Sequence, residues 1–335
     1  MSERKTSPEF DRASRTGTTL ETGRLPSVER VPGPKGNEPR RDNAPAGSTV
    51  EKAGKDVTRA RKNAAMLARK NVPEPSAADM SAYVDAHLPA HLRAPSPFVR
   101  AVSRALDLAM RAKEFLGTYA VVGRENIPKD GAFLAISNHS GGETGKLLAL
   151  FGDKPFHIAA GKELNFNRSS VREWLLKKLQ MIPVKETLAH LSPEEKDELM
   201  RRVPERSKPG YERIIQNEAA GSVPSNKEFI QTTVAALMKG DRAVVFPEGL
   251  FTYGDRGLRK AYSGFLLIAS EYKRQTGKDL RLLPVGCSKS KTSVGEPFVL
   301  GGTASVDDAM ERIAALLPEG ERGKYGDDKK DDERL

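Results

Sequence analysis

The sequence lacks the segments that would place it in an oxidising compartment or inside a bilayer. It has one cysteine, Cys287, so no disulfide can form within the chain. Its first fourteen residues carry charges and no apolar core, which is not typical of a secretory signal. The longest apolar runs, such as residues 264–269, are far too short to cross a bilayer. We therefore expect any membrane contact to be peripheral.

Motifs for metal or nucleic-acid binding are also missing. The histidines show no metal-ligand spacing, and we find no zinc finger, no RNP-like aromatic motif and no basic repeat. The chain is nonetheless basic, with a formal net charge of +10 over 335 residues. This balance favours an anionic partner, either anionic lipid or a phosphorylated substrate, over nucleic acid. Sequence-independent nucleic-acid binding by a basic arm is the weaker alternative.

Composition divides the chain into a polar arm and a folded part. Residues 1–75 are rich in Pro, Gly, Ser, Thr, Arg and Glu, with apolar residues that follow no period. We expect this arm to be disordered, with a short helix over 57–70 as the alternative. Residues 76–117 are predicted to form a connector and an amphipathic helix, 118–317 a folded domain and 318–335 a charged tail.

The amphipathic helix of this connector covers residues 98–116. Apolar residues share one face, arginines share the opposite face, and Gly117 stands where a C-terminal cap belongs. Such a helix can pack on a sheet or dock on an anionic membrane, and the sequence leaves both open. The predicted apolar face holds Phe98, Val102, Ala105, Leu106, Ala109 and Leu116, and the basic face holds Arg100, Arg104 and Arg111.

From residue 118 onward, short β-rich runs alternate with helical ones. This alternation predicts an α/β domain with a mixed, largely parallel sheet flanked by helices. A polar excursion over 186–225 interrupts it, with one or two helices at 193–201 and 211–219. The predicted strands are 119–122, 132–137, 156–160, 181–184, 243–246 and 281–285. The predicted helices are 77–87, 143–151, 170–179, 226–239, 260–274 and 305–317.

One segment combines a strand end, a histidine and a glycine pair ahead of a helix: residues 134–150, LAISNHSGGETGKLLAL. The strand-end His139 can exchange a proton near neutral pH. Gly141 and Gly142 lack side chains, so a substrate can approach the backbone closely. The helix N-terminus favours developing negative charge. Taken alone, His139 could instead be a histidine bonded to the backbone.

A second segment, residues 241–253, brings another buried strand to the sequence FPEG. In open α/β sheets ligands bind at the carboxyl ends of the strands. Taken alone, FPEG is only a turn that ends a strand. The next strand, RLLPV at 281–285, carries Pro284 near its carboxyl end. The four residues of the FPEG segment are Phe246, Pro247, Glu248 and Gly249.

Together these segments resemble the phospholipid and glycerol acyltransferase superfamily, over roughly residues 118–300. The matching segments, in family order, are VGRENIP (122–128), SNH (137–139), FPEG (246–249), LPV (283–285) and GEP (295–297). The resemblance implies an O-acyltransferase similar to 1-acylglycerol-3-phosphate acyltransferase. In that class His139 would deprotonate an acceptor hydroxyl, which attacks an acyl thioester, and Glu143 would hold the ring. Acyl-CoA or acyl carrier protein is the implied co-substrate, with no cofactor and no metal.

The sequence departs from the family pattern at three places. The family acid lies five residues after the histidine, where this chain has Thr144, and Glu143 is one residue early. Lys185 replaces an arginine and can meet a phosphate only as a point charge. The arginine expected after FPEG is absent, with Arg256 or Arg259 as the candidates to replace it.

Several of these residues have structural alternatives. Ser140 and Glu143 match a capping box. Glu143 could serve that cap in place of a catalytic role, or it could do both. Lys185 and Arg256 are alternatively solvated charges. The resemblance implies substrate-binding roles for Asn138, Gly141, Gly142, Lys185, Phe246, Pro247, Glu248, Gly249, Arg256 and Pro284.

The function predicted from these features is transfer of a fatty acyl group from a thioester to the hydroxyl of a lysophospholipid or related lipid. The implied location is cytoplasmic, peripheral on the inner face of a membrane whose anionic surface is a partner. The shifted acid and altered arginines motivate the alternative, a catalytically inactive protein of the same fold that binds lipid or acyl carrier.

Overall fold

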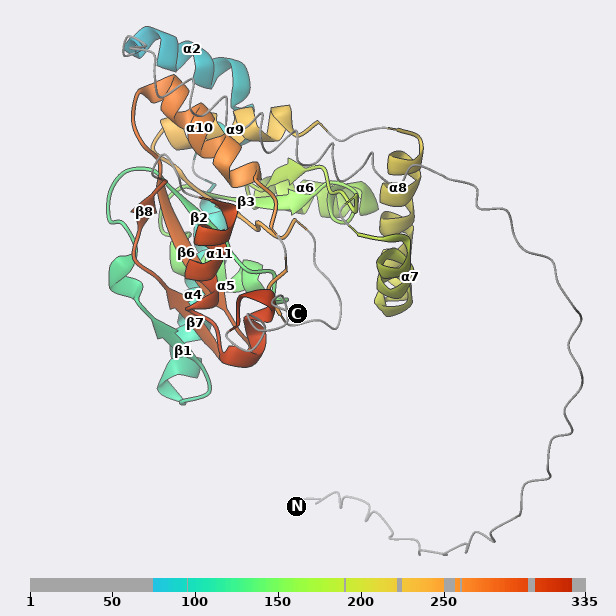
Figure 1. Cartoon of the computed structure of the whole chain (residues 1–335). Helices are drawn as coiled ribbons and strands as arrows, with labels where there is room; N and C mark the ends of the chain where they lie inside the picture. The colour runs from blue at the N-terminus through green and yellow to red at the C-terminus, as the bar shows by residue number, and fades with distance from the viewer. Residues whose placement is uncertain are drawn as a thin grey trace, which may run out of the picture. The chain divides into compact units, whose positions relative to one another are not determined.

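The computed structural model describes residues 75–94, 96–189, 191–221, 225–249, 257–259, 261–300 and 305–326. These residues form an eight-stranded sheet with helices on both faces (Figure 1). The strands are β1 Ala120–Val122, β2 Phe133–Ser137, β3 Phe156–Gly161, β4 Ile182–Val184, β5 Arg242–Val245, β6 Arg281–Cys287, β7 Lys291–Val294 and β8 Phe298–Val299. The predicted arm over 1–75, save its last residue, and its alternative helix lie outside the described residues.

The strand order β1-β7-β6-β2-β5-β3-β4, with β8 also paired to β6, gives the sheet a parallel centre. β6, β2, β5, β3 and β4 are parallel neighbours in that order. β7 and β8 run antiparallel to β6, so the sheet is mixed and largely parallel, which confirms the predicted fold class. The sequence did not predict β7 and β8, because the short segments KTSV and FV carry little β signal.

Three helices cover one face of the sheet: α4 Pro97–Phe115, α5 Glu143–Phe151 and α6 Ser170–Lys178. Parallel strands covered on both faces are continuously apolar, as FLAIS in β2 shows, where every residue is buried. Phe133, Phe151 and Phe156 pack their rings together beneath these helices. The face therefore rests on a contiguous apolar cluster that joins α4, α5 and α6.

The opposite face is covered by α2 Ala77–His87, α3 Ala90–Arg93, α9 Lys227–Met238, α10 Gly264–Thr276 and α11 Val306–Ala314. The predicted excursion forms two helices, α7 Pro193–Arg202 and α8 Lys208–Ala219, around the buried ring of Tyr211 (Figure 1). α3 was not predicted, because prolines border it on both sides. The short 3-10 helices are η1 Arg124–Asn126, η2 Phe166–Arg168, η3 Glu205–Ser207, η4 Glu319–Glu321 and η5 Gly323–Tyr325.

The amphipathic helix is present as α4, but its buried face differs from the prediction. Ser96 caps its start with a bond from Val99 N–H, and Gly117 follows its end at φ +67° as predicted. The residues buried against the sheet are Val99, Ser103 and Met110, while Phe98 and Leu116 are exposed. The predicted face was wrong because α4 carries apolar residues on two sides. Among the described residues, every helix is too short or too polar to cross a bilayer.

A buried hydrogen-bonded pair, His157 and Asp241, ties the starts of β3 and β5 together. His157 Nε2 lies 3.0 Å from Asp241 Oδ2, and His157 Nδ1 lies 3.1 Å from Gln180 O. Both side chains are buried, and Asp241 Oδ2 also accepts a hydrogen bond from Lys239 Nζ at 3.4 Å. Removing one partner of such a pair leaves the other uncompensated in an apolar surrounding.

We expect Asp241→Ala to lower the free energy of unfolding by about 3 kcal/mol, because it strands the His157 ring in the core. Urea unfolding followed by circular dichroism measures this change. Asp279→Ala is the matched control, since Asp279 pairs with Lys273 at the surface and such pairs contribute about 1 kcal/mol or less. Equal losses in the two variants would contradict the buried-pair account.

Candidate active site

Residues that follow four parallel strands meet at one edge of the sheet. The last pairs before this edge are Ile136 with Val245, Val244 with Ile158, and Gly161 with Val184. β2 and β5 lead to His139 and Glu248, which are hydrogen-bonded to each other. β3 and β4 lead to Lys162 and Lys185, which directly follow the paired residues Gly161 and Val184. Parallel pairing therefore brings together residues that are up to 109 positions apart in the chain.

His139 and Glu143 are in direct contact at this edge of the sheet. His139 Nδ1 lies 2.5 Å from Glu143 Oε1, and the Glu143 side chain is only 3% exposed. The chain turns between them at Gly141 and Gly142, whose φ angles of +81° and +74° are costly for residues with a side chain. This turn lets an acid four residues after the histidine reach the ring. The displaced acid of the sequence motif thus occupies a position from which it can orient His139.

The capping-box interpretation of Ser140 and Glu143 is wrong. α5 begins at Glu143, its N-cap is Gly142, and no side chain caps it. Glu143 is therefore the first helical residue and not the third, so Ser140 is not in the capping position. Its carboxylate faces the His139 ring and the backbone N–H groups of Glu143 and Gly141.

These contacts decide the charge of Glu143. Burial opposes ionisation, but the hydrogen bond and charge of His139, with the two backbone N–H groups, outweigh it, so the pKa of Glu143 is lowered. The start of α5 adds a favourable field for a negative charge. An ionised Glu143 beside the ring would stabilise a positive charge on His139.

The FPEG segment contacts His139 through the ring of Phe246 and the carboxylate of Glu248. The Phe246 ring stacks on the His139 ring, with 4.5 Å between centroids. Glu248 accepts hydrogen bonds from His139 N at 2.9 Å and Arg259 N at 3.2 Å. Burial raises the pKa of Glu248, against the opposing effect of those two N–H groups. Glu248 is thus a positioning residue, bonded to backbone on both oxygens.

The turn after Glu248 has no room for a side chain. Gly249 has a φ of +73°, and a Cβ built on it would lie 2.7 Å from the Tyr262 ring. Pro247 O accepts a hydrogen bond from Tyr262 N, which fixes the same turn from the backbone. Pro247 and Gly249 therefore shape the edge of the site together with Tyr262.

Two of the residues predicted to bind substrate are engaged in the sheet. The Asn138 amide donates to Cys287 O at 2.9 Å and accepts from Cys287 N at 2.7 Å, so it joins the ends of β2 and β6. Pro284 lies inside β6, buried and paired with Ile136, and not near the exit of the strand. The contacts of these two residues in the structure are with protein, and their substrate-binding role stays a prediction. Arg256 lies outside the described residues.

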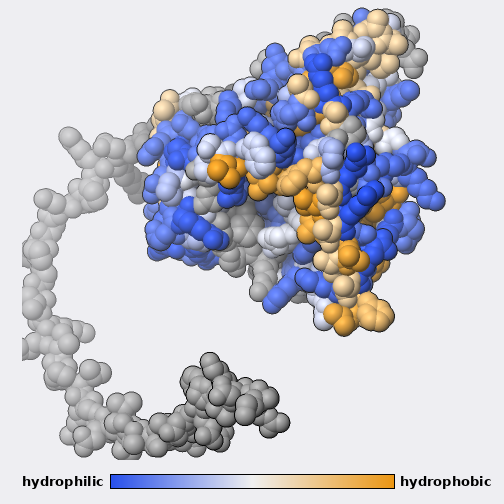
Figure 2. Space-filling model, turned by 180° about the vertical axis from the view of Figure 1, so that it is seen from behind, coloured by the Kyte–Doolittle hydropathy of each residue, from blue (hydrophilic) through white to orange (hydrophobic). Residues whose placement is uncertain are grey.

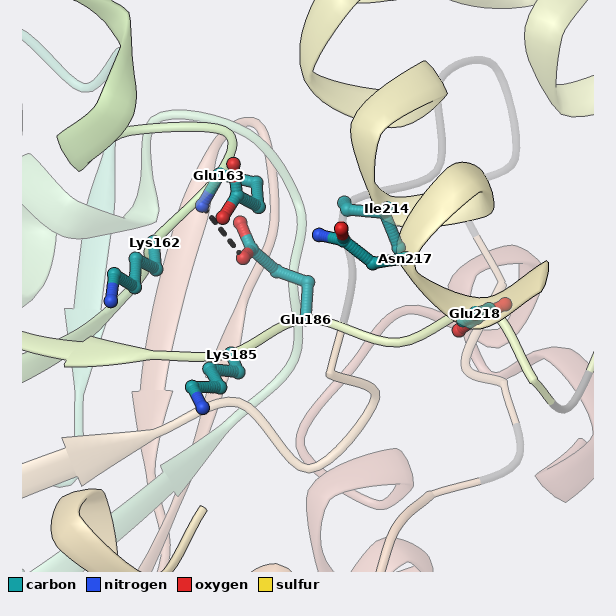
Figure 3. A pocket seen from close by; sticks show the side chains of 7 residues that line it. All are labelled: Lys162, Glu163, Lys185, Glu186, Ile214, Asn217 and Glu218. Carbon is teal, nitrogen blue, oxygen red and sulfur yellow. Dashed lines mark hydrogen bonds between the residues drawn. The ribbon is translucent and has the colours of Figure 1, made fainter. Parts of the chain in front are cut away.

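Lys185 is joined by a second lysine that sequence reasoning missed. Lys162 and Lys185 follow the paired ends of β3 and β4, and both are exposed at a pocket of about 140 Å³. Figure 3 shows the two side chains leaving adjacent strand ends, with Glu186 turned the other way to bond Glu163 N. The available signal was that each lysine immediately follows a β-rich run. Among the described residues, no three His, Cys, Asp or Glu side chains gather as a metal site.

A histidine held by a buried carboxylate at the carboxyl edge of a parallel sheet has the arrangement of a general base. The family model for acyltransferases matches residues 118–288, just over half of the chain. The chain therefore belongs to the acyltransferase family, within the phospholipid and glycerol acyltransferase superfamily that its motifs resemble.

No curated protein matches the sequence. One similar solved structure is the 1-acyl-sn-glycerophosphate (LPA) acyltransferase PlsC from Thermotoga maritima. It shares 18% identity over 72% of this chain and 83% of its own, with a TM-score of 0.40.

The lowered pKa of Glu143 predicts a pH-dependent contribution to stability. A carboxylate with a lowered pKa stabilises the fold above its unfolded value, 4.5, and this stabilisation is lost as the pH falls through the folded value. We expect Glu143→Gln to unfold about 2 kcal/mol more easily at pH 7. The difference from wild type should shrink below pH 4.5.

Urea unfolding of both proteins across this pH range provides the measurement. Glu173→Gln is the control, because Glu173 forms an exposed pair with Lys177. A difference that stayed constant with pH would show that Glu143 acts in packing and not through its charge.

Proposed function

We propose that this protein transfers a fatty acyl group from a thioester to the hydroxyl of a lysophospholipid, with His139 as the general base. The contact between His139 Nδ1 and Glu143 Oε1 is the observation that supports this most directly. It pairs a half-buried ring with a buried carboxylate at the edge where α/β folds bind ligands. Acyl-CoA and acyl carrier protein are the candidate donors, and no metal or cofactor is required.

The reaction follows from this geometry. With Nδ1 directed at Glu143, the ring accepts the proton of the acceptor hydroxyl at Nε2. The hydroxyl oxygen bonds to the thioester carbonyl carbon, the C–S bond then breaks, and the leaving thiolate takes the proton back from the imidazolium. Glu143 remains ionised and stabilises the imidazolium in between. The serine of a catalytic triad is replaced here by the acceptor itself.

The acceptor phosphate is assigned to Lys162 and Lys185. They follow β3 and β4, which are two and three strands away from β2 in the sheet, or about 10 and 14 Å at the usual strand spacing. Two ammonium groups attract a phosphate without the bidentate geometry of an arginine. We therefore propose an acceptor that carries its phosphate at one end and its free hydroxyl toward His139.

The same proposal places the protein at a membrane. A lysophospholipid resides in the bilayer, while acyl-CoA and acyl carrier protein are water-soluble. The net charge of +10 favours an anionic surface. We propose a cytoplasmic protein that is peripheral on the inner face of the membrane.

The inactive-protein alternative was motivated by the displaced acid and the altered arginines. The acid contacts the histidine despite its displacement, and a lysine pair stands where a single arginine was expected. Both observations favour the enzyme over a binding protein of the same fold.

We expect His139→Ala to lower turnover at least about 10³-fold, because the acceptor hydroxyl loses its base. Glu143→Gln should lower it about 10- to 100-fold, through a less stable imidazolium. The assay follows labelled acyl transfer from acyl-CoA, and separately from acyl carrier protein, to a panel of lysolipids. His91→Ala is a histidine control outside the site, and circular dichroism verifies that each variant is folded. Undiminished turnover in His139→Ala would refute the mechanism.

We expect the double variant Lys162→Gln, Lys185→Gln to raise KM about tenfold or more for a phosphate-bearing acceptor, through the loss of charge-assisted contacts. An uncharged acceptor such as a monoacylglycerol should show little change. Lys278→Gln removes an exposed lysine that precedes β6, at the opposite edge of the sheet, and serves as the control. An equal effect on charged and uncharged acceptors would exclude these lysines as the phosphate site.

A further inference from the structure

Exposed apolar side chains are concentrated on two helices of one face. Among the described residues, ten large hydrophobic side chains are exposed, and seven of them lie on α4, its C-cap and α6. Single exposed apolar residues are ordinary, but a contiguous group marks an interaction surface. We name this group the α4–α6 surface. Its seven residues are Phe98, Leu108, Phe115, Leu116, Val171, Trp174 and Leu175.

The exposed side of α4 is regularly apolar. Residues at alternating intervals of three and four line it, and all are exposed. This spacing keeps them on one stripe of a helix, roughly opposite Ser103 and Met110, which are buried. Phe115 is 91% exposed at the end of the stripe. The stripe consists of Phe98, Ala101, Ala105, Leu108, Ala112 and Phe115.

α6 continues this stripe. Ser96 Oγ, just before α4, donates to Lys178 O at the end of α6 at 3.1 Å, so the two helices adjoin. Val171 and Trp174 on α6 are 73% and 56% exposed. Figure 2 shows hydrophobic residues gathered in a band across this face, with hydrophilic residues on either side. The exposed apolar residues of α4 and α6 therefore lie on the same face of the sheet, and the two helices meet where α4 begins and α6 ends.

Both helices reach the edge of the sheet that carries His139. α4 ends just before Ala120, whose N–H bonds Ser290 O beyond the carboxyl end of β6, next to β2. α6 follows the carboxyl end of β3 and runs back toward the start of β4. A planar surface that covers the α4–α6 surface would therefore lie next to the sheet edge that carries His139.

The charges around the surface are mainly basic. α4 carries four basic and two acidic residues, and α6 carries three basic and one acidic. Asp107 and Glu114, the acids of α4, are held in ion pairs with Arg111 and Arg124. Basic residues outside those pairs remain beside the apolar band. They are Arg100, Arg104, Lys113 and Lys178.

We infer that the α4–α6 surface docks on a bilayer containing anionic phospholipid, with the Trp174 ring in the headgroup region. An apolar band bordered by basic residues matches such an interface, where tryptophan is favoured. A second copy would oppose basic residues to basic residues. Residues 1–74 carry sixteen Lys and Arg against ten Asp and Glu. Their net charge is positive, so the basic residues of the α4–α6 surface would repel them as well. The inference rests on the proposed lipid acceptor, since docking would bring His139 to the level of that acceptor.

The chain offers a direct probe, because Trp174 is its only tryptophan. Full-length protein is mixed with vesicles of phosphatidylcholine alone or with an equal part of phosphatidylglycerol. We expect the Trp174 emission to shift to shorter wavelength with the anionic vesicles, and brominated lipid to quench it. High salt should weaken binding, since it screens the basic residues.

Substitutions then locate the contact. The pairs Val171→Ser with Leu175→Ser, and Leu108→Ser with Phe115→Ser, should each lower vesicle partitioning about tenfold in flotation. Arg100→Gln with Arg104→Gln should lower it only on anionic vesicles. Leu267→Ser is the matched control, because Leu267 is 43% exposed on α10, over the opposite face of the sheet. It should partition like wild type.

Three outcomes would overturn the inference: no binding to anionic vesicles, binding without a change in Trp174 emission, or a shift that depends on protein concentration and not on lipid. The last would indicate a second copy. Turnover of a short-chain, water-soluble acceptor is measured in parallel. Lost docking with retained turnover would refute the docking surface alone, and docking without turnover would refute the proposed enzyme alone.

Discussion

Backbone hydrogen bonds between β2 and β5 hold Ile136 opposite Val245, three residues before His139 and Glu248 respectively. The same parallel register continues through β3 to β4 and determines which side chains meet at the edge. A slip of one residue would turn the buried apolar faces of these strands outward, so the packing on both sides enforces the register. The positions of His139, Glu248 and the two lysines all depend on that pairing.

Two buried glutamates in this site have opposite electrostatic environments. Burial raises the pKa of Glu248, and its two backbone N–H bonds compensate only in part. Glu143 is buried as well, but the His139 ring and the start of α5 lower its pKa. The difference arises because Glu143 faces a group that can carry positive charge, whereas Glu248 faces the backbone. Similar side chains thus serve as a charge partner and as a structural tie.

The face formed by α4 and α6 shows how one helix can meet two different requirements. α4 buries Val99, Ser103 and Met110 against the sheet, and Ser103 satisfies its hydroxyl by bonding Leu148 O. Its other apolar side has no role in that packing. An apolar stripe exposed to water is unfavourable, and the docking that we propose would cover it with lipid.

The sequence alone determined the α/β class, because short apolar runs alternate with helical ones, and it located His139 and FPEG through their order and strand context. The sequence also identified Glu143 as the acidic residue nearest to the position of the family acid. It did not show whether Glu143 caps a helix or contacts the His139 ring, because both roles need the same residue types. Only the tertiary structure decided between them, because α5 starts at Glu143 and the turn at Gly141 and Gly142 aims the carboxylate at the ring.

The tertiary structure also decided the roles that depend on which strands are neighbours. Asn138 is tied to β6 and Lys162 stands beside Lys185, neither of which local sequence reveals, because strand order is set by long-range packing. The buried side of α4 was undetermined for the same reason. A helix with two apolar sides has no local preference for either, and the shape of the sheet and α5 beneath it selects the one that is buried.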